Sequence, residues 1–209
     1  MQDPGTGPLE KVTLLRTGDS SAAIYDEWAT AYDADLVDDV GYVSPRTAAR
    51  ALAETLDTPD TPIADYGCGT GLVGRELQAM GYTTVDGIDV SAAMLEVARA
   101  KGCYRQLLRA DLTEAPPIAV DAYGAMICVG VMGAGHLVPE HFGALFRTVR
   151  PGGPIVLYGN ATPYAEDGYA ERFAAIAEWE IVRTEESNYM TALNRPGMLI
   201  VGRRRAQST

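Results

Sequence analysis

The sequence predicts a doubly wound α/β fold, in which helices cover both faces of a mostly parallel sheet. Beyond residue 62, short apolar runs alternate with longer amphipathic segments, and glycine or proline stands at most junctions. Such alternation is typical of parallel strands joined by crossover helices. Hydrophobic residues make up 47% of the 209-residue chain, which is enough for the core of one such domain.

Two helices are expected before the alternating region. Residues 1–18 are rich in glycine and proline without a sustained period, so we expect a mobile leader there. From residue 19 onward, apolar residues recur three to four positions apart, which predicts a helix. A second helix is expected to begin at Ser44 and Pro45, with the serine as N-cap and the proline in the first helical position.

Strands and helices then follow one another. Five strands are expected, at residues 63–66, 83–88, 104–109, 122–129 and 155–158. The helices expected between and after them cover residues 72–80, 91–101, 139–149 and 169–177. Gly81 and Gly102 are predicted to end the first two of these helices, and Ser91 to cap the second. Residues 180–189 and 198–203 are expected to form a closing pair of strands.

The strongest functional signal is a glycine-rich segment that follows a strand and opens a helix. Glycine lets the backbone turn tightly and approach a ligand that a Cβ would displace, and the helix N-terminus behind it favours an anionic group. The spacing is Gly-x-Gly-x-Gly, whereas the dinucleotide form requires glycine at the position of Leu72. The alternative is that this glycine-rich segment only makes a tight turn between the strand and the helix and binds no ligand. The residues expected to bind a cofactor here are Asp65, Gly67, Cys68, Gly69 and Gly71.

Two acids continue the series at strand ends. Asp89 lies 24 residues after Asp65, and Asp111 lies 22 residues after Asp89. An acid at Asp89 can accept hydrogen bonds from both ribose hydroxyls, as the corresponding acid of dinucleotide-binding folds does. Asp111 and the N–H of the next residue suit an adenine ring. The alternative for Asp89 is that it caps the following helix, and the alternative for Asp111 is that it is an ordinary acidic residue of a loop. Four apolar residues are also expected to contact the cofactor: Val90, Met94, Leu112 and Val129. For Met94, packing in the hydrophobic core is the alternative.

Together these motifs resemble those of the class I S-adenosylmethionine-dependent methyltransferases, from Tyr25 to Arg203. The resemblance implies a Rossmann-like seven-stranded sheet, mostly parallel with an antiparallel C-terminal strand, and one such domain over residues 19–205. It implies S-adenosylmethionine as cofactor and S-adenosylhomocysteine as product. The inferred activity is methyl transfer.

A closer similarity is to the Williams–Beuren syndrome candidate-region methyltransferase group. Its Tyr-Asp-x-Trp-Ala-x-x-Tyr-Asp segment matches residues 25–33, and its loop after the fourth strand resembles residues 129–135. The similarity implies that residues 19–58 form lid helices over the cofactor. Tyr25, Trp28 and Tyr32 would then contact its methionine end; plain helix packing of this aromatic stripe is the alternative.

The expected methyl acceptor is a small molecule. The chain lacks the Asn/Asp-Pro-Pro-Tyr/Phe motif of many enzymes that methylate amino groups of DNA and protein, and no large insertion follows the fifth strand. His136 is a candidate general base, because an unperturbed imidazole titrates near pH ~6.5; an idle loop histidine is the alternative. His141 is expected on an exposed helix. Residues at the end of the fifth strand are candidates for substrate contact: Tyr158, Asn160 and Tyr164.

The amino-acid composition argues against several classes of binding partner. A formal net charge of −11 argues against nucleic acid, whose binding requires a basic surface. No apolar run approaches the roughly 20 residues of a membrane helix, and the first 20 residues lack a signal peptide, so we expect a cytoplasmic protein without a membrane partner. The three cysteines and two histidines are too dispersed to predict a metal site. The oligomeric state stays open.

Two other functions fit many of the same features. A nicotinamide-dependent oxidoreductase has a related fold, but the glycine spacing and the lack of a Tyr-x-x-x-Lys hydride-transfer set oppose it. A non-catalytic S-adenosylmethionine-binding protein would carry the same cofactor residues without turnover.

Overall fold

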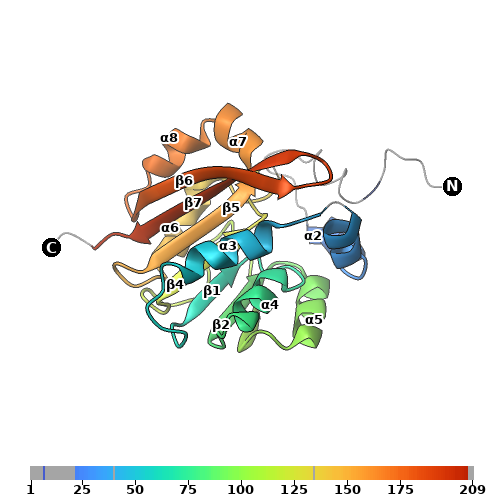
Figure 1. The fold of residues 1–209 in the computed structure, drawn as a ribbon. Coiled ribbons are helices and arrows are strands. Elements are labelled where there is room, and N and C mark those ends of the chain that lie inside the picture. The colour runs from blue at the N-terminus through green and yellow to red at the C-terminus, as the bar shows by residue number, and fades with distance from the viewer. Residues whose placement is uncertain (1–6, 8–21, 40, 134, 207–209) are drawn as a thin grey trace.

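The computed structural model describes residue 7 and residues 22–39, 41–133 and 135–206. Except for Gly7, the expected leader lies outside the described residues. One sheet of seven strands has the order β3-β2-β1-β4-β5-β7-β6 (Figure 1). The strands are β1 (Ile63–Tyr66), β2 (Val85–Asp89), β3 (Gln106–Arg109), β4 (Ala125–Val129), β5 (Pro154–Asn160), β6 (Trp179–Met190) and β7 (Arg195–Arg204).

The direction of the strands confirms the predicted architecture. Strands β1 to β5 pair in parallel, and β7 is antiparallel to both of its neighbours, β5 and β6. Around the sheet lie α2 (Ala22–Trp28), the π-helix η1 (Ala34–Asp39), α3 (Ser44–Ala53), α4 (Leu72–Ala79), α5 (Ala92–Lys101), α6 (Pro139–Phe146), α7 (Ala161–Glu166) and α8 (Tyr169–Ala174). Among the described residues, no helix is long and apolar enough to cross a membrane.

Each face of the sheet has its own hydrophobic core. Residues of α3 and α4 pack on one face, and residues of α6 and α8 pack on the other. Adjacent strand residues serve opposite cores, so that Ile63 belongs to the first and Ala64 to the second. Burial on both faces explains why the central strands are continuous apolar runs instead of alternating ones.

Local signals at three helix ends were read correctly. The Ser91 hydroxyl accepts a hydrogen bond from the Met94 N–H at 3.1 Å and caps α5. Gly102 ends that helix in the left-handed conformation, with φ of 63°, and Gly81 follows α4 with φ of 95°. Glycine adopts these angles without the strain that a Cβ adds.

The prediction that Ser44 is the N-cap of its helix is wrong. Val43 is the N-cap of α3, so Ser44 is already helical and Pro45 follows it. The buried Ser44 hydroxyl instead donates to the Tyr189 carbonyl at 3.1 Å, and thereby joins α3 to the end of β6. The Ser44 hydroxyl therefore forms a hydrogen bond with a distant buried carbonyl instead of capping the helix, as the local pattern predicts.

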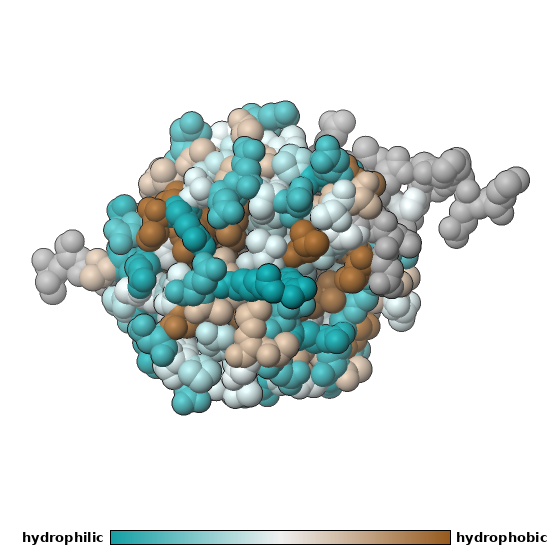
Figure 2. Space-filling view, viewed as in Figure 1, coloured by the Kyte–Doolittle hydropathy of each residue, from teal (hydrophilic) through white to brown (hydrophobic). Residues whose placement is uncertain are grey.

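Several boundaries also differ from those expected. The single front helix is divided, because α2 ends at Trp28 and a turn precedes η1. The short helix α7 was not predicted, although Asn160 before it provides the usual signal: its side chain accepts from the Thr162 N–H at 3.0 Å. In the space-filling view, residues of hydrophilic and intermediate hydropathy cover most of the visible face, and hydrophobic ones form small patches among them (Figure 2).

We predict that Phe173→Ala lowers the free energy of unfolding by about 3–5 kcal/mol, the usual cost of emptying a buried phenylalanine site. Phe173 on α8 is fully buried, with its ring 5.3 Å from that of Phe142 and 5.8 Å from that of Trp179. The control is Val182→Ala on the edge strand β6, where the side chain is 59% exposed and the loss should stay below about 1 kcal/mol. Urea denaturation measures both, and equal losses would contradict the prediction.

Candidate functional site

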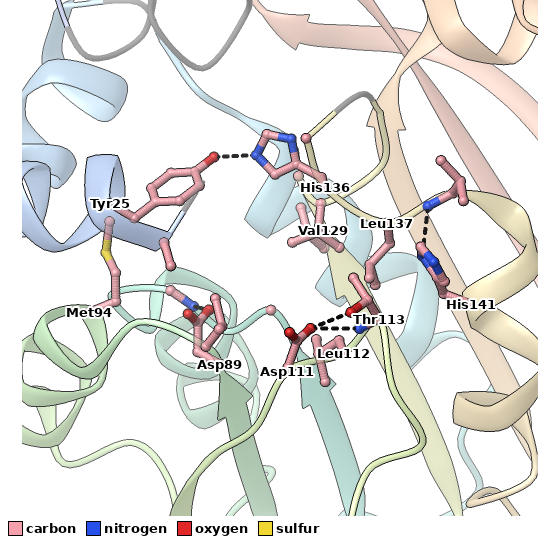
Figure 3. Close-up of a pocket in the computed structure, with 18 of the residues that line it drawn as sticks. Tyr25, Asp89, Met94, Asp111, Leu112, Thr113, Val129, His136, Leu137 and His141 are labelled. Carbon is pink, nitrogen blue, oxygen red and sulfur yellow. Dashed lines mark hydrogen bonds between the residues drawn. The ribbon is translucent and has the colours of Figure 1, made fainter. Parts of the chain in front are cut away.

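A cavity of about 480 Å³ opens at the carboxyl ends of the parallel strands (Figure 3). Its walls come from α2, the loops after β1 to β4 and the beginning of α6. It brings together eleven residues that were expected in the site: Tyr25, Tyr32, Gly67, Gly69, Asp89, Val90, Met94, Asp111, Leu112, Val129 and His136. Ligands of open α/β sheets bind at this edge.

The glycine loop after β1 is fixed to the end of β2. The N–H groups of Gly67 and Cys68 both donate to the Ile88 carbonyl, at 2.8 and 3.1 Å. A Cβ at Gly67 would lie 2.3 Å from the Val131 side chain, whereas one at Gly69 would meet no atom within 4 Å. Gly67 is therefore required by packing, and Gly69 leaves open space where its backbone borders the cavity.

Asp89 connects this loop to the end of β2. Its carboxylate accepts from the Gly69 N–H at 2.8 Å and from the Ser91 N–H at 2.9 Å, one bond to each oxygen. Burial raises the pKa of Asp89, and the backbone hydrogen bonds oppose that rise. A carboxylate oxygen has a second lone pair, so the group can still accept hydrogen bonds from a ligand in the cavity.

The opposite end of the same wall contains Asp111 and its neighbours. One oxygen of Asp111 accepts from the Thr113 N–H at 2.9 Å and from the Thr113 hydroxyl at 2.7 Å. Leu112 is nearly buried between the two polar residues, and Met94 projects from α5 with almost no exposed surface. This region therefore offers an apolar slot with polar groups at one edge, which suits a planar heterocycle.

Asp65 lies beneath the loop instead of lining the cavity. One carboxylate oxygen accepts from the Tyr104 hydroxyl at 2.6 Å, and the other has no hydrogen-bond partner among the described residues. Burial raises the pKa of Asp65 to about 7. Two more expected residues lie next to the cavity: Gly71 packs against α5, and Cys68 borders a small recess behind the loop.

The N-terminal aromatic residues have two different environments. Tyr25 and Tyr32 line the cavity, and the Tyr25 hydroxyl lies 2.8 Å from His136 Nε2. Trp28 is buried in the core, where its N–H donates to Asp35 at 2.6 Å. The stripe that was expected to contact a ligand is therefore partly core, with only its outer members facing the cavity.

Two acids attach this N-terminal segment to the rest of the site. Asp26 accepts from the Ser91 hydroxyl at 2.5 Å and from the Ala93 N–H at 3.2 Å, and the bond to Ser91 is the main reason that its pKa is lowered. Asp33 accepts from the Thr70 hydroxyl at 2.5 Å and forms an ion pair with Lys101 at 2.5 Å. The segment is thus bonded directly to the glycine loop and α5.

The three residues expected to contact a substrate lie outside the cavity. Tyr158 is fully buried, and its hydroxyl contacts the Ser187 side chain and the Asn188 carbonyl. Asn160 caps α7, and Tyr164 packs against the second core. The end of β5 is covered by the loop after β4, because a Cβ at Gly159 would lie 2.5 Å from the Met132 side chain.

His141 corrects the expectation of an exposed position, because it lines the cavity. Its Nδ1 lies 3.2 Å from the Val138 N–H, just before α6 begins. Proline favours the first position of a helix, so Pro139 indicates that residue 141 lies in the first helical turn. That turn follows the fourth strand and therefore lies near the edge of the sheet where ligands bind. Val131, Leu137 and Val138 also line the cavity, although only the tertiary fold places these apolar loop residues there.

Comparison with known proteins gives one family match. Residues 63–153 match the family model described as a methyltransferase domain. The chain is 38% identical to methyltransferase-like protein 27 of Homo sapiens over 140 residues, which cover 64% of this chain and 55% of that protein. The chain thus spans little more than half the length of this relative.

Solved structures agree on the fold. An S-adenosylmethionine-dependent methyltransferase from Mesorhizobium loti superposes with a TM-score of 0.59 at 21% identity, covering 77% of this chain and all of that one. The cyclase SpnF superposes with a TM-score of 0.73 at 15% identity, covering 92% and 97% of the two chains. At such identities the likeness shows the fold alone.

We predict that Asp65→Asn makes the free energy of unfolding less dependent on pH. A carboxyl with a pKa raised from 3.8 to about 7 stabilises the folded state fully below about pH 4, and this contribution disappears as the pH rises through 7. The wild type should therefore lose stability relative to the variant between about pH 4 and 8, at up to 1.36 kcal/mol per pH unit. Urea denaturation across this range measures the difference, and parallel profiles would show that Asp65 is charged throughout.

Proposed function

We propose that this chain, which belongs to the class I S-adenosylmethionine-dependent methyltransferases, transfers a methyl group from that cofactor to a small-molecule acceptor bound in the same cavity. The main support is the convergence of Gly69, Asp89 and Leu112 on one cavity from three separate strand ends. A volume of about 480 Å³ is typical of sites for small ligands.

Residues of the cavity suit the adenine, the ribose and the positively charged sulfur of this cofactor. The open space at Gly69 admits the ligand next to the backbone, and the remaining lone pairs of Asp89 suit the two ribose hydroxyls. Met94 and Leu112 provide apolar surface for the adenine ring. The rings of Tyr25 and Tyr32 suit a positively charged group, because the faces of aromatic rings attract cations.

The bound cofactor would supply a methyl group on a positively charged sulfur, a good leaving group. The protein must then hold donor and acceptor in line and exclude water. The loop after β4 and the segment from Ala22 to Asp39 border the cavity and can serve both needs. A methyl group is transferred without a further cofactor, so no additional site is required.

A small acceptor agrees with the surface as well as with the cavity. The net charge of −11 opposes the approach of a nucleic-acid backbone. The acceptor must also share a cavity of about 480 Å³ with the cofactor, bordered by α2, which favours a compact molecule. A nicotinamide-dependent reaction and cofactor binding without turnover are the two alternatives that the following measurements separate.

We further propose that residues 22–39 act as a lid. The segment is attached by partly buried hydrogen bonds and an ion pair, through Asp26 and Asp33, and by the buried side chains of Trp28, Ala29 and Leu36. Polar contacts that solvent can still reach contribute only modest net stability, because water replaces them. A ligand that contacts Tyr25 and Tyr32 would add the apolar contacts that hold the segment closed.

We predict that Gly69→Ala weakens binding of S-adenosylhomocysteine at least tenfold, a loss of about 1.4 kcal/mol. The added Cβ would occupy space that the ligand needs. The matched control is Gly102→Ala, which has a similar positive φ and equally open surroundings but lies at the end of α5, away from the cavity. Both variants bear similar backbone strain, so only the first should lose affinity in calorimetry.

The wild type provides the second part of this test. S-adenosylhomocysteine should raise the melting temperature, since a ligand that binds only the folded state stabilises it, and NAD should not. Stabilisation by NAD alone, or equal affinity of the two glycine variants for S-adenosylhomocysteine, would disprove the assigned cofactor site.

We also predict that S-adenosylhomocysteine slows hydrogen exchange of the amides in residues 22–34 by at least tenfold. These amides belong to the proposed lid, whereas those of β4, buried in the sheet, should be protected with or without ligand. Mass spectrometry after a short deuterium pulse measures both segments. Equal protection of residues 22–34 in both states would mean that the segment is permanently packed and is not a lid.

A further inference from the structure

The wall opposite the cofactor residues is formed by the loop after β4 and the start of α6. His136, Leu137 and His141 lie there, across the cavity from Met94 and Asp89 (Figure 3). The loop is bonded to itself, since the Leu137 N–H donates to the Val131 carbonyl at 2.8 Å and the His136 N–H donates to the Gly133 carbonyl at 3.1 Å. These bonds fix the backbone of the loop, and each imidazole is oriented by its own side-chain contact, His136 with Tyr25 and His141 with the Val138 N–H.

His141 presents a hydrogen-bond donor. The Val138 N–H can only donate, so the Nδ1 atom of His141 that receives its bond at 3.2 Å must be without a proton. The neutral ring then carries its proton on Nε2. Such a group binds an oxygen acceptor and is unsuited to remove a proton from it.

His136 and Tyr25 form a pair suited to receive a proton. The tyrosine hydroxyl and His136 Nε2 lie 2.8 Å apart, close enough for a proton to pass between them. Burial raises the pKa of Tyr25 well above its usual range, so the phenol ends the step neutral. A proton that reaches its oxygen replaces the tyrosine's own proton, which passes to His136 Nε2. Both residues line the cavity, so an acceptor can reach the pair.

The rest of this wall is apolar. Val131, Leu137 and Val138 provide the surface, and the only carboxylates among the described lining residues are Asp89 and Asp111, on the cofactor side. A cationic amine would therefore find no charged partner at this wall. An apolar ring with oxygen substituents matches both the surface and the two imidazoles.

We propose that the methyl acceptor is a hydroxy-aromatic compound with a second oxygen substituent: the Tyr25–His136 pair takes the phenolic proton, and His141 Nε2–H binds the second oxygen. The inference rests on the proposed methyl transfer. In the balanced step the acceptor O–H proton passes to the pair, a C–O bond forms to the methyl carbon, and the C–S bond breaks with its electrons left on sulfur. An imidazolium titrates near ~6.5, and a phenol near ~10 is much easier for it to deprotonate than an alcohol near ~16.

The acceptor class is tested with the full chain and S-adenosylmethionine by measuring release of S-adenosylhomocysteine. We expect turnover with ortho-, meta- or para-hydroxyacetophenone, a higher KM with phenol, and none with cyclohexanol or with benzylamine, an amine that is cationic at neutral pH. Methylation of the amine or the alcohol at a similar rate would overturn the proposal. So would the absence of turnover with every phenol by a protein that binds S-adenosylhomocysteine; failure to bind that ligand would instead disprove the proposed function.

Variants separate the two imidazoles. His141→Asn keeps an oxygen that can accept from Val138 but removes Nε2–H, so KM for the best hydroxyacetophenone should rise at least tenfold, and that for phenol less. His136→Gln should lower kcat about 100-fold, the usual contribution of a general base, with little change in S-adenosylhomocysteine affinity. Glu140→Gln, in the same first turn of α6 but exposed and paired with Arg172, is the matched control and should alter neither value. Equal KM increases for phenol and hydroxyacetophenone in His141→Asn, or an unchanged kcat in His136→Gln, would overturn the assigned roles.

Discussion

The attachment of the glycine loop to the end of β2 is the constraint on which the rest of the site depends. The Ile88 carbonyl accepts two successive loop N–H groups, and Asp89 accepts a third from Gly69. The resulting backbone path needs positive φ angles, and it brings Gly67 so close to Val131 that no side chain fits between them. The loops after β1, β2 and β4 therefore meet at one point, and the cavity is the space that they leave at the sheet edge.

The N-terminal segment depends on the same loop. Asp33 bonds to Thr70 within it, and Asp26 bonds to Ser91, which follows the Asp89 that anchors it. Asp26 also lies at the N-terminus of α5, where exposed N–H groups and the helix dipole favour a negative charge. The segment is thus bonded to Thr70 and Ser91, which lie close in sequence to Gly69 and Asp89 at the cavity, so a change in the loop would reach the segment directly.

How far the sequence predicts this arrangement depends on whether a signal is local. Helix stops at Gly102 and Gly81, the Ser91 cap and the alternation of strands and helices along the chain follow from short-range patterns, and all agree with the structure. Tyr158, Asn160 and Tyr164 follow a strand end as the cofactor residues do, but Met132 from another loop covers that end of β5. Ser44 was misassigned because its hydroxyl bonds to the distant Tyr189 carbonyl, and the position of His141 was missed because only the fold places the first turn of α6 against the cavity.

The contact between Tyr25 and His136 joins two functions that the chain keeps on separate elements. Tyr25 comes from α2, which covers the cavity, and His136 comes from the loop after β4, which forms the proposed acceptor wall. The proposed proton-accepting pair therefore requires α2 in the position that the structure shows. If residues 22–39 act as the proposed lid, the movement that admits water to the cavity also separates the pair. Under the proposed mechanism, the same closure of α2 excludes water and assembles the base. While the cavity is open, the acceptor therefore lacks the base that would remove its proton.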